Sequence, residues 1–286
     1  MAAPELIDLL HMGQERTIAC YLLDTPDGPA LFDCGPTTCL DALEAGLARR
    51  GVALADVRHL LLSHIHLDHA GAAGVLVRRH PRLRVHVSEI GAPHLVDPSR
   101  LEASARRLYG DAFDTLWGEL APVPEANVEI VGDRVLGLDC FPTPGHAGHH
   151  VSYLDADGTL YAGDAAGVRV QPGRAVIPPT PPPEVDVELW ERTIDEIERR
   201  DPDRLALIHF GVADDPGRHL AELELTLLDW AEAVEGGATQ EEFVAYVQQE
   251  LEVSGEDVNA FTQALSLVQS YAGLKRWADK RAAAAG

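Results

Sequence analysis

Apolar and polar positions alternate in short runs up to about residue 209, a pattern that indicates strands separated by turns and helices. Residues 17–24 and 30–33 are expected to pair as strands across the turn-forming sequence Pro-Asp-Gly-Pro at 26–29. Further apolar runs bounded by breakers predict strands at residues 58–62, 83–87, 128–141, 151–162 and 204–209. These runs predict two sheet-rich halves flanked by helices.

Helical spacing of apolar residues predicts the segments between these strands. Thr38 and Asp41 have the spacing of a capping box, and the residues that follow continue at helical spacing. Further helices are predicted at residues 71–80, 99–120 (one or two short helices) and 187–197. The proline-rich stretch 171–183 is incompatible with a helix and is predicted to be a loop.

After Pro216 the pattern becomes entirely helical, with three successive apolar stripes. Thr239 with Glu242, and Ser254 with Asp257, have the spacing of capping boxes that would start two of these helices. We therefore predict two parts, residues 1–215 as a catalytic domain and residues 216–286 as a C-terminal helical extension. The extension carries more apolar surface than a solvated tail tolerates, so we expect a homodimer through these helices, with a lid over the pocket as the alternative.

The charge balance narrows the classes of partner. Lys and Arg number 23 against 46 Asp and Glu, which gives a formal net charge of −23. A field of that sign repels phosphate backbones, so the expected partner is a small-molecule substrate and not a nucleic acid. The start of the chain lacks the pattern of a secretion signal and no apolar run is long enough for a membrane span, so a cytoplasmic location is expected. The four cysteines show no metal-binding spacing and are expected to be reduced and buried.

Four side chains of metal-ligand type occur within six residues of one another, directly after a predicted strand. They lie in the sequence Ser63-His64-Ile-His66-Leu-Asp68-His69. On extended backbone His64 and His66 can point to the same side, while Asp68 and His69 follow one turn later. This spacing predicts a metal site, because a loop after a strand can fold such ligands around a point.

Three further segments each end a predicted strand region with one ligand-type residue. They are Thr-Pro-Gly-His146, Tyr-Ala-Gly-Asp164 and Leu-Ile-His209. Glycine precedes the first two ligand-type residues, as expected where the backbone turns tightly. Three histidines and a carboxylate alone could close a structural zinc site, so these additional residues indicate a larger centre.

Taken in order, these motifs resemble those of the metallo-β-lactamase superfamily over roughly residues 5 to 215. The resemblance implies an α+β fold, the αββα sandwich, here with a C-terminal helical extension. It implies that His64, His66 and His146 bind one metal ion, that Asp68, His69 and His209 bind a second, and that Asp164 bridges them. It also places Asp33 on the aspartate that supports the metal loops, in the sequence Phe-Asp-Cys-Gly at 32–35.

This ligand set predicts a metal-dependent hydrolase. Two ions about 3.5–4 Å apart can hold a bridging hydroxide, because metal binding lowers the pKa of water from about 15.7 to around 7. The expected substrate bond is an ester, thioester, lactone or phosphodiester, and Asp68 is the candidate catalytic residue that orients the hydroxide or carries its proton. Nitrogen and carboxylate ligands suit zinc, the expected metal, as well as iron or manganese.

Other functions and residues remain open at this point. The alternative activity is that of a mononuclear iron oxidoreductase of the persulfide dioxygenase type, and a non-enzymatic binding protein is a third class. His149 is expected either to contact a ligand or substrate or simply to pack. Arg169 and Arg174 are expected to be solvated, with anion binding as the alternative. The aromatic residues between 109 and 117 predict either a lid or a small hydrophobic cluster.

Overall fold

The computed structural model describes residues 4–285, and the chain forms two compact units within it. The first unit comprises the chain up to Pro142 together with His149–Asp157, and the second comprises Thr143–Gly148 and the chain from Gly158 onwards. Residues 1–3, on which the expectation about a secretion signal partly rests, lie outside the described residues. The boundary predicted after residue 215 stays a prediction, although a helix does begin at Pro216.

The first unit contains a six-stranded sheet whose strands follow the sequence order. These are β1 (Glu5–Asp8), β2 (Ala19–Thr25), β3 (Gly28–Phe32), β4 (His59–Leu61), β5 (Arg84–Val87) and β6 (Val128–Ile130). The first two pairings are antiparallel and the rest are parallel, so the predicted hairpin around residues 26–29 is confirmed. Parallel neighbours need crossover connections, which here contain helices.

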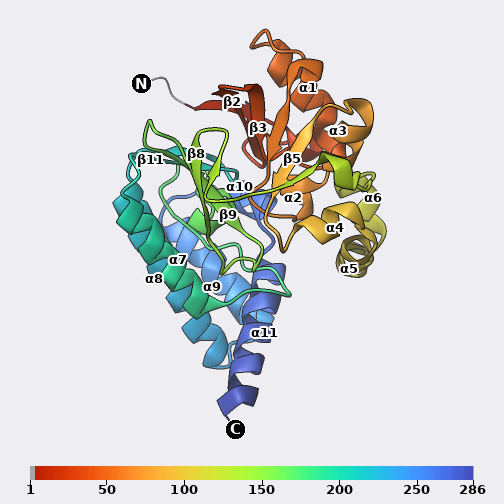
Figure 1. Ribbon diagram of the computed structural model, residues 1–286. Coiled ribbons are helices and arrows are strands. Elements are labelled where there is room, and N and C mark those ends of the chain that lie inside the picture. Colours follow the sequence, from red (N-terminus) through yellow and green to blue (C-terminus); the bar gives the residue numbers. More distant parts are fainter. Residues whose placement is uncertain (1–3, 286) are drawn as a thin grey trace. The chain divides into compact units, whose positions relative to one another are not determined.

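Helices connect the parallel strands of this sheet (Figure 1), and those at residues 40–48, 73–79, 99–109 and 113–116 agree with predicted helical segments, whereas those at 67–70 and 92–96 were not predicted. They are α1 (Leu40–Ala48), α2 (Leu67–Ala70), α3 (Ala73–Arg79), α4 (Ala92–Val96), α5 (Ser99–Tyr109) and α6 (Phe113–Leu116). Tyr109 of α5, Phe113 of α6 and Trp117, which directly follows α6, pack with Leu67 of α2 in a hydrophobic cluster. Of the two functions considered for these aromatic residues, the structure supports the cluster.

The first unit also contains an antiparallel meander of three strands, β7 (Arg134–Val135), β8 (Leu138–Pro142) and β9 (Val151–Leu154). Tyr153 of β9 is completely buried and packs edge-on against Phe32 of β3, with 5.9 Å between ring centroids. Its hydroxyl donates a hydrogen bond of 3.0 Å to the carbonyl of Leu62. A buried tyrosine with its hydroxyl satisfied joins this meander to the loop that follows β4.

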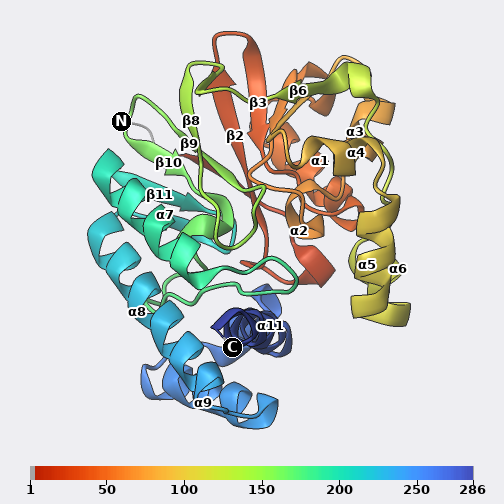
Figure 2. The same ribbon diagram turned by 60° about the horizontal axis from the view of Figure 1, so that its bottom comes forward.

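The second unit contains β10 (Thr159–Tyr161), β11 (Arg204–Leu207) and β12 (Gly211–Ala213). β10 and β11 are parallel and are connected through α7 (Val187–Arg200), while β12 returns antiparallel to β11. The buried face of α7 carries Val187, Trp190, Ile194 and Ile197, which confirms the predicted amphipathic helix. Figure 2 shows α7 beside α8 (Pro216–Glu235) in this unit.

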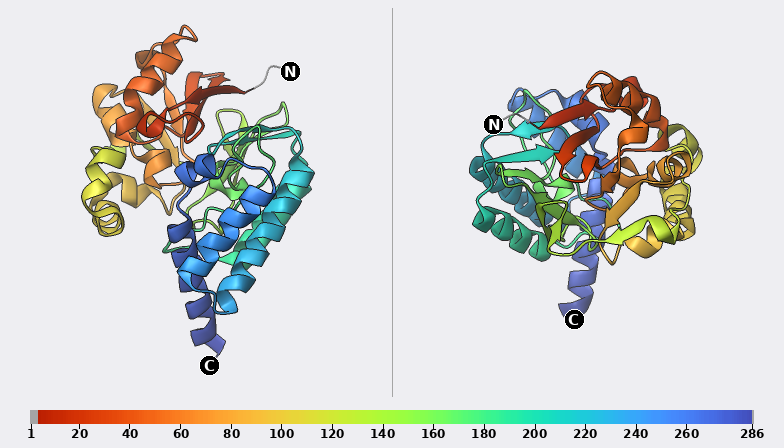
Figure 3. Two further views of the ribbon diagram at one scale, coloured as in Figure 1. Left: turned by 180° about the vertical axis from the view of Figure 1, so that it is seen from behind. Right: turned by 45° about the horizontal axis from the view of Figure 1, so that its top comes forward.

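Three more helices follow α8, namely α9 (Gln240–Val253), α10 (Val258–Ala264) and α11 (Leu267–Ala285). α8, α9 and α11 pack on one another (Figure 3), and Phe243 of α9 packs edge-on against Trp230 of α8. The last helix packs within its own chain, because Leu274 and Trp277 are both buried. Homodimerisation itself stays a prediction. Among the described residues, no helix combines the length and apolar character needed to cross a bilayer.

Two of the three predicted capping boxes are wrong. The hydroxyl of Thr38 does not cap α1 and donates to the carbonyl of Leu116 instead. Ser254 ends α9, and the residue that caps α10 is Asp257, whose carboxylate accepts from the amide of Ala260. The capping box of α9 is confirmed, with Thr239 as its first residue.

The four cysteines are buried and form no disulfide, as expected for reduced thiols. Burial raises the pKa of the Cys39 thiol to about 12, and burial also raises the pKa values of Cys20 and Cys34.

The capping assignment yields a first prediction. Thr239→Ala should lower the free energy of unfolding by about 1 kcal/mol, because the amide of Glu242 loses its acceptor at the start of α9. Ser254→Ala, at the residue that follows the same helix and makes no side-chain capping bond, should change it by less than about 0.5 kcal/mol. Urea unfolding followed by circular dichroism measures both, and equal losses in the two variants would contradict the assignment.

Candidate metal centre

The first unit brings together four of the predicted ligands. β4 leads into the loop that carries His64 and His66, and His66 is the residue before α2, which carries Asp68 and His69. The ring of His64 lies 4.4 Å from that of His66 and 4.1 Å from that of His69, measured between centroids. His64 and His69 are completely buried, whereas His66 and Asp68 are partly exposed. The strand end and the short helix thus gather one carboxylate and three imidazoles.

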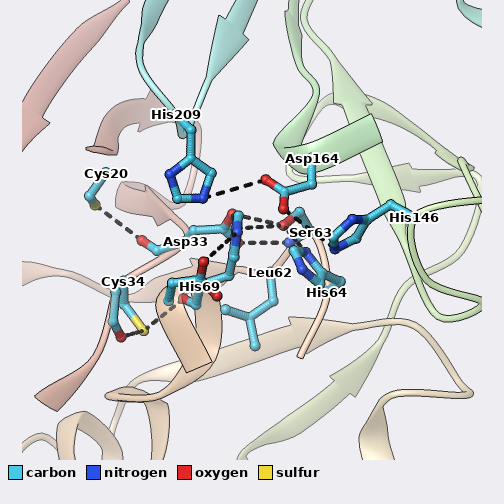
Figure 4. A network of polar contacts seen from close by, with 12 residues as sticks. Cys20, Asp33, Cys34, Leu62, Ser63, His64, His69, His146, Asp164 and His209 are labelled. Atoms are coloured by element: carbon cyan, nitrogen blue, oxygen red, sulfur yellow. Dashed lines mark hydrogen bonds and ion pairs between the residues drawn. The ribbon is translucent and has the colours of Figure 1, made fainter. Parts of the chain in front are cut away.

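Asp33, just after β3, holds this loop in place (Figure 4). Its carboxylate accepts from the amide of Ser63 (2.8 Å), from the Ser63 hydroxyl (2.7 Å) and from Nδ1 of His69 (2.8 Å). Because a carboxylate only accepts, the proton of the His69 ring is on Nδ1 and its Nε2 is left with the lone pair that a metal needs. The supporting role expected for Asp33 is confirmed.

Ser63 is a supporting residue that sequence reasoning missed. Its hydroxyl oxygen lies 2.9 Å from Nδ1 of His64 while it donates to Asp33, so it connects the buried carboxylate to a second imidazole. The available signal is its position directly before the histidine motif, but a serine at a strand end is also an ordinary loop residue.

Two further histidines, just before β9, lie against the ligand rings of the first unit. The ring of His149 is nearly parallel to that of His64 and perpendicular to that of His66, with centroids 5.9 and 5.8 Å away. The ring of His150 stacks on His64 at 4.9 Å. The amide of Val151 donates to the carbonyl of Ser63, which ties β9 to the same loop. The ring of His149 thus packs against two predicted ligands, and a hydrogen bond from it to a ligand or substrate stays a prediction.

The second unit brings together the other three predicted ligands, His146, Asp164 and His209, all of them buried. Oδ2 of Asp164 lies 3.4 Å from Nε2 of His146, and Oδ1 lies 3.7 Å from Nε2 of His209 (Figure 4). Two ligand atoms on one tetrahedral zinc ion are about 3.4 Å apart, given bond lengths of about 2.1 Å. Asp164 thus faces a different histidine with each oxygen, at separations that suit an ion between each pair.

The helix α7 positions two of these ligands. Trp190 lies edge-on to the ring of His146, and its indole N–H donates to the carbonyl of Ala165, the residue after Asp164. At Gly145, where φ is +138°, an added Cβ would be 2.4 Å from Cβ of Trp190. Only glycine therefore permits this close approach of the two backbones. The Thr-Pro-Gly-His sequence belongs to the second unit because α7 holds it there.

Arg169 does not form a free anion site. Its guanidinium donates to the carboxylate of Asp215 at 2.5 Å, and only 12% of its side chain is exposed. Its backbone amide donates to the carbonyl of His209, so this ion pair stands beside a predicted ligand. Arg169 is therefore neither a solvated loop charge nor a free anion site, the two roles considered for it, because it forms an internal ion pair with Asp215.

A buried histidine of α8 supports the loop that carries Asp164. The ring of His219 is completely buried, and Nε2 donates to the carbonyl of Ala166 at 2.7 Å. Burial lowers the pKa of His219 from its usual 6.5 to about 4, so the ring is neutral at neutral pH.

The donor set fits divalent transition-metal ions. All seven predicted ligands belong to groups whose atoms could hold an ion, and no other His, Cys, Asp or Glu among residues 4–285 does. The donors are imidazole nitrogens and carboxylate oxygens without thiolate, a set that suits zinc, iron and manganese. Beyond this fit, the grouping of the two sets into one centre stays a prediction.

The chain belongs to the metallo-β-lactamase superfamily, whose family model matches residues 13–209. A metallo-β-lactamase fold-containing protein of Sulfurisphaera tokodaii, ST1585, is 27% identical over 163 residues, covering 54% of this chain and 60% of that protein. The crystal structure of ST1585 has a TM-score of 0.64 at 21% identity and covers 91% of this chain and 93% of its own. The predicted α+β fold with a C-terminal helical region is thereby confirmed.

Two other proteins are also similar. An N-acyl homoserine lactonase of a Bacillus species is 27% identical over 176 residues, covering 52% of this chain and 60% of the lactonase. A di-iron-bound structure of the protein TTHA1623 has a TM-score of 0.55 at 24% identity, covering 73% of this chain and 94% of that one. The chain matches about 60% of the length of these two relatives, and this partial match does not establish that it shares their activities.

The support that Asp33 gives to His69 leads to a second prediction. Asp33→Asn keeps the size of the side chain but replaces one acceptor oxygen with an amide donor, so Ser63 and His69 cannot both be satisfied. Metal affinity should fall about 10- to 100-fold at one of the sites. Dialysis against a weak chelator followed by metal analysis measures this. Asp27→Asn, in an exposed turn, is the control, and unchanged affinity in Asp33→Asn would contradict the role.

The depressed pKa of His219 leads to a third prediction. The unfolded chain binds this proton near pH 6.5 and the folded chain near pH 4, so the stabilisation is present above pH 6.5 and is lost as the pH falls toward 4. Between pH 7 and pH 5 the wild type should lose about 2 kcal/mol more unfolding free energy than His219→Gln, which cannot titrate. Urea unfolding at both pH values tests this, and equal pH dependence would be incompatible with a buried neutral ring.

Proposed function

We propose that the two sets of ligands combine into one dinuclear centre of a metal-dependent hydrolase. His64, His66 and His146 hold one ion, Asp68, His69 and His209 hold the other, and Asp164 bridges them. The observation that carries this proposal is that the two carboxylate oxygens of Asp164 face different histidines, at 3.4 and 3.7 Å. A carboxylate that served a single ion would not need a histidine at each oxygen.

The protein's own hydrogen bonds prepare the imidazoles for such ions. His69 donates from Nδ1 to Asp33, and His146 donates from Nδ1 to the carbonyl of Pro179 at 2.7 Å. Both rings therefore present Nε2, which fixes the tautomer before any ion binds. When bound, two such ions supply a nucleophile from water at neutral pH and polarise the carbonyl or phosphoryl oxygen of the substrate. Zinc is the proposed metal, and the di-iron form of TTHA1623 keeps iron as an alternative.

Asp68 is the proposed catalytic residue of this chain. It lies in the first turn of α2 and is partly exposed, with its side chain 26% accessible. One carboxylate oxygen lies 3.8 Å from Nε2 of His69, a distance at which both atoms can bind the same ion. The second oxygen then remains to orient the attacking water and to pass its proton to the leaving group.

A neutral ester or lactone is the proposed substrate among the bonds that such a centre can hydrolyse. The similarity to an N-acyl homoserine lactonase supports a carbonyl substrate. The net charge of −23 disfavours anionic phosphodiesters, and the partly buried Arg169, whose amide donates to the carbonyl of His209, is already paired with Asp215. Thioesters share the carbonyl chemistry and are the next class to test.

The bridging position yields a fourth prediction. The wild type should carry close to two transition-metal ions per chain and hydrolyse a lactone or ester, and a chelator should abolish the reaction. Asp164→Ala should lower occupancy of both ions, because one residue serves both, and should reduce the rate at least about 100-fold. Asp111→Ala removes an exposed carboxylate and should change neither quantity.

Metal analysis beside a panel of lactones, esters, thioesters and phosphodiesters measures these outcomes. An Asp164→Ala variant that keeps one ion fully bound would show that Asp164 does not bridge. One iron per chain, with oxygen consumption on a persulfide and no hydrolysis, would replace the proposal with the mononuclear dioxygenase alternative.

A further inference from the structure

A proline-rich segment of the second unit connects the C-terminal helix to one of the proposed metal ligands. The carbonyl of Pro179 accepts the hydrogen bond from Nδ1 of His146. The next residue, Thr180, is completely buried, and its hydroxyl donates to the carbonyl of Ser270 in α11 at 3.1 Å. Two consecutive residues thus bind a metal ligand on one side and α11 on the other.

This segment has few other means of fixing its position. It reads Pro-Pro-Thr-Pro-Pro-Pro over residues 178–183, so five of its six residues have no N–H group. A sheet cannot hold such a segment by ladder hydrogen bonds. Its position therefore depends on packing and on groups that bind its carbonyls and the hydroxyl of Thr180.

The helix α11 supplies those groups. At Gly273 an added Cβ would lie 1.9 Å from the carbonyl oxygen of Thr180 and 2.8 Å from the carbonyl carbon of Pro181. The helix backbone therefore touches the segment directly, which only glycine allows. Arg276 and Lys280 donate to the carbonyl of Pro183 one and two turns further along the helix.

The end of α11 is itself attached to the same unit. The indole N–H of Trp277 donates to Glu188 of α7 at 2.9 Å, and Arg281 forms an ion pair with the same carboxylate. The same helix α7 packs on Gly145 and on the ring of His146. His146 is therefore held by α7 and by the proline-rich segment, and α11 contacts both of them.

We propose that α11 is a positioning element for the metal centre, acting through Ser270 and Gly273 on Thr180, and through the Pro179 carbonyl on His146. The contact keeps the proton of His146 on Nδ1 and aims Nε2 at the ion. The proposal rests on the proposed function in so far as His146 binds a metal. It assigns the C-terminal helix a role in ligand orientation, in addition to covering apolar surface.

Gly273→Ala tests the contact, with Gly217→Ala as a matched control. Both replace a helical glycine, but an added Cβ at Gly217 meets nothing within 4 Å. Metal-free protein would be titrated with Zn²⁺ in competition with a chromophoric chelator. Gly273→Ala should bind one of the two ions about 10- to 100-fold more weakly, while Gly217→Ala binds both as the wild type does. Equal affinity of Gly273→Ala and wild type for both ions would overturn the proposal.

A second pair of variants guards against misfolding of Gly273→Ala. Thr180→Val replaces the hydroxyl that donates to the Ser270 carbonyl with a methyl group, whereas Thr180→Ser keeps that hydroxyl. Thermal unfolding by circular dichroism establishes that each variant is folded. Weaker metal binding in Thr180→Val together with wild-type binding in Thr180→Ser supports the positioning role. Wild-type affinity in Thr180→Val contradicts it.

A readout without metal separates this proposal from the proposed function. Long-range ¹H–¹⁵N spectra of the histidine rings in metal-free protein report the tautomer of His146. The wild type should show the proton on Nδ1, and Gly273→Ala and Thr180→Val should show a mixture of tautomers. If the wild type bound no metal but this difference appeared, the proposed function would fail while the positioning of His146 by α11 would stand. An identical tautomer in all variants would overturn the positioning role.

Discussion

Burial of two carboxylates is the constraint on which the arrangement of the ligands depends. Removing a charged carboxylate from water costs several kcal/mol unless its oxygens gain strong partners. Asp33 meets that requirement through three hydrogen bonds from Ser63 and His69. Asp164 lies among imidazoles, and positive charge at its two oxygens is the strongest compensation available to it. One carboxylate therefore organises the histidine loop of the first unit, and the other defines where cations belong in the second.

The elements and the ligand types could be predicted because both leave local signals. Strands and helices near the site are bounded by turn residues and apolar periodicity, and α7 and α9 were predicted from such patterns. The histidine motif after β4 is compact enough to stand out by itself. His146, Asp164 and His209 are recognisable only as single ligand-type residues at the ends of predicted strand regions, and the resemblance to a known family is what assigns each of them to a metal ion.

Supporting contacts could not be predicted, because each depends on a residue distant in sequence. The hydroxyl of Thr38 has the spacing of a cap, yet the carbonyl of Leu116, 78 residues away, is the acceptor that it finds. Arg169 is next to a predicted ligand, but its charge is matched by Asp215, 46 residues later. Trp277 falls on an amphipathic stripe, and nothing in that stripe indicates that Glu188 receives its N–H. Local patterns predict helices and strands, whereas the tertiary structure determines which side chains form hydrogen bonds and ion pairs with one another.

The chain passes from one unit to the other three times, which limits how it can be truncated or recombined with a relative. The segment Thr143–Gly148 belongs to the second unit, although the strands before and after it, β8 and β9, belong to the first. No single cut can therefore separate the two units as continuous fragments. A chimera of two relatives joined at one crossover point cannot inherit one complete unit from each parent, because any such crossover splits at least one unit. Exchange of whole units requires three junctions, one at each boundary between the units. Only such an exchange keeps the ligands of each unit together with the residues that support them.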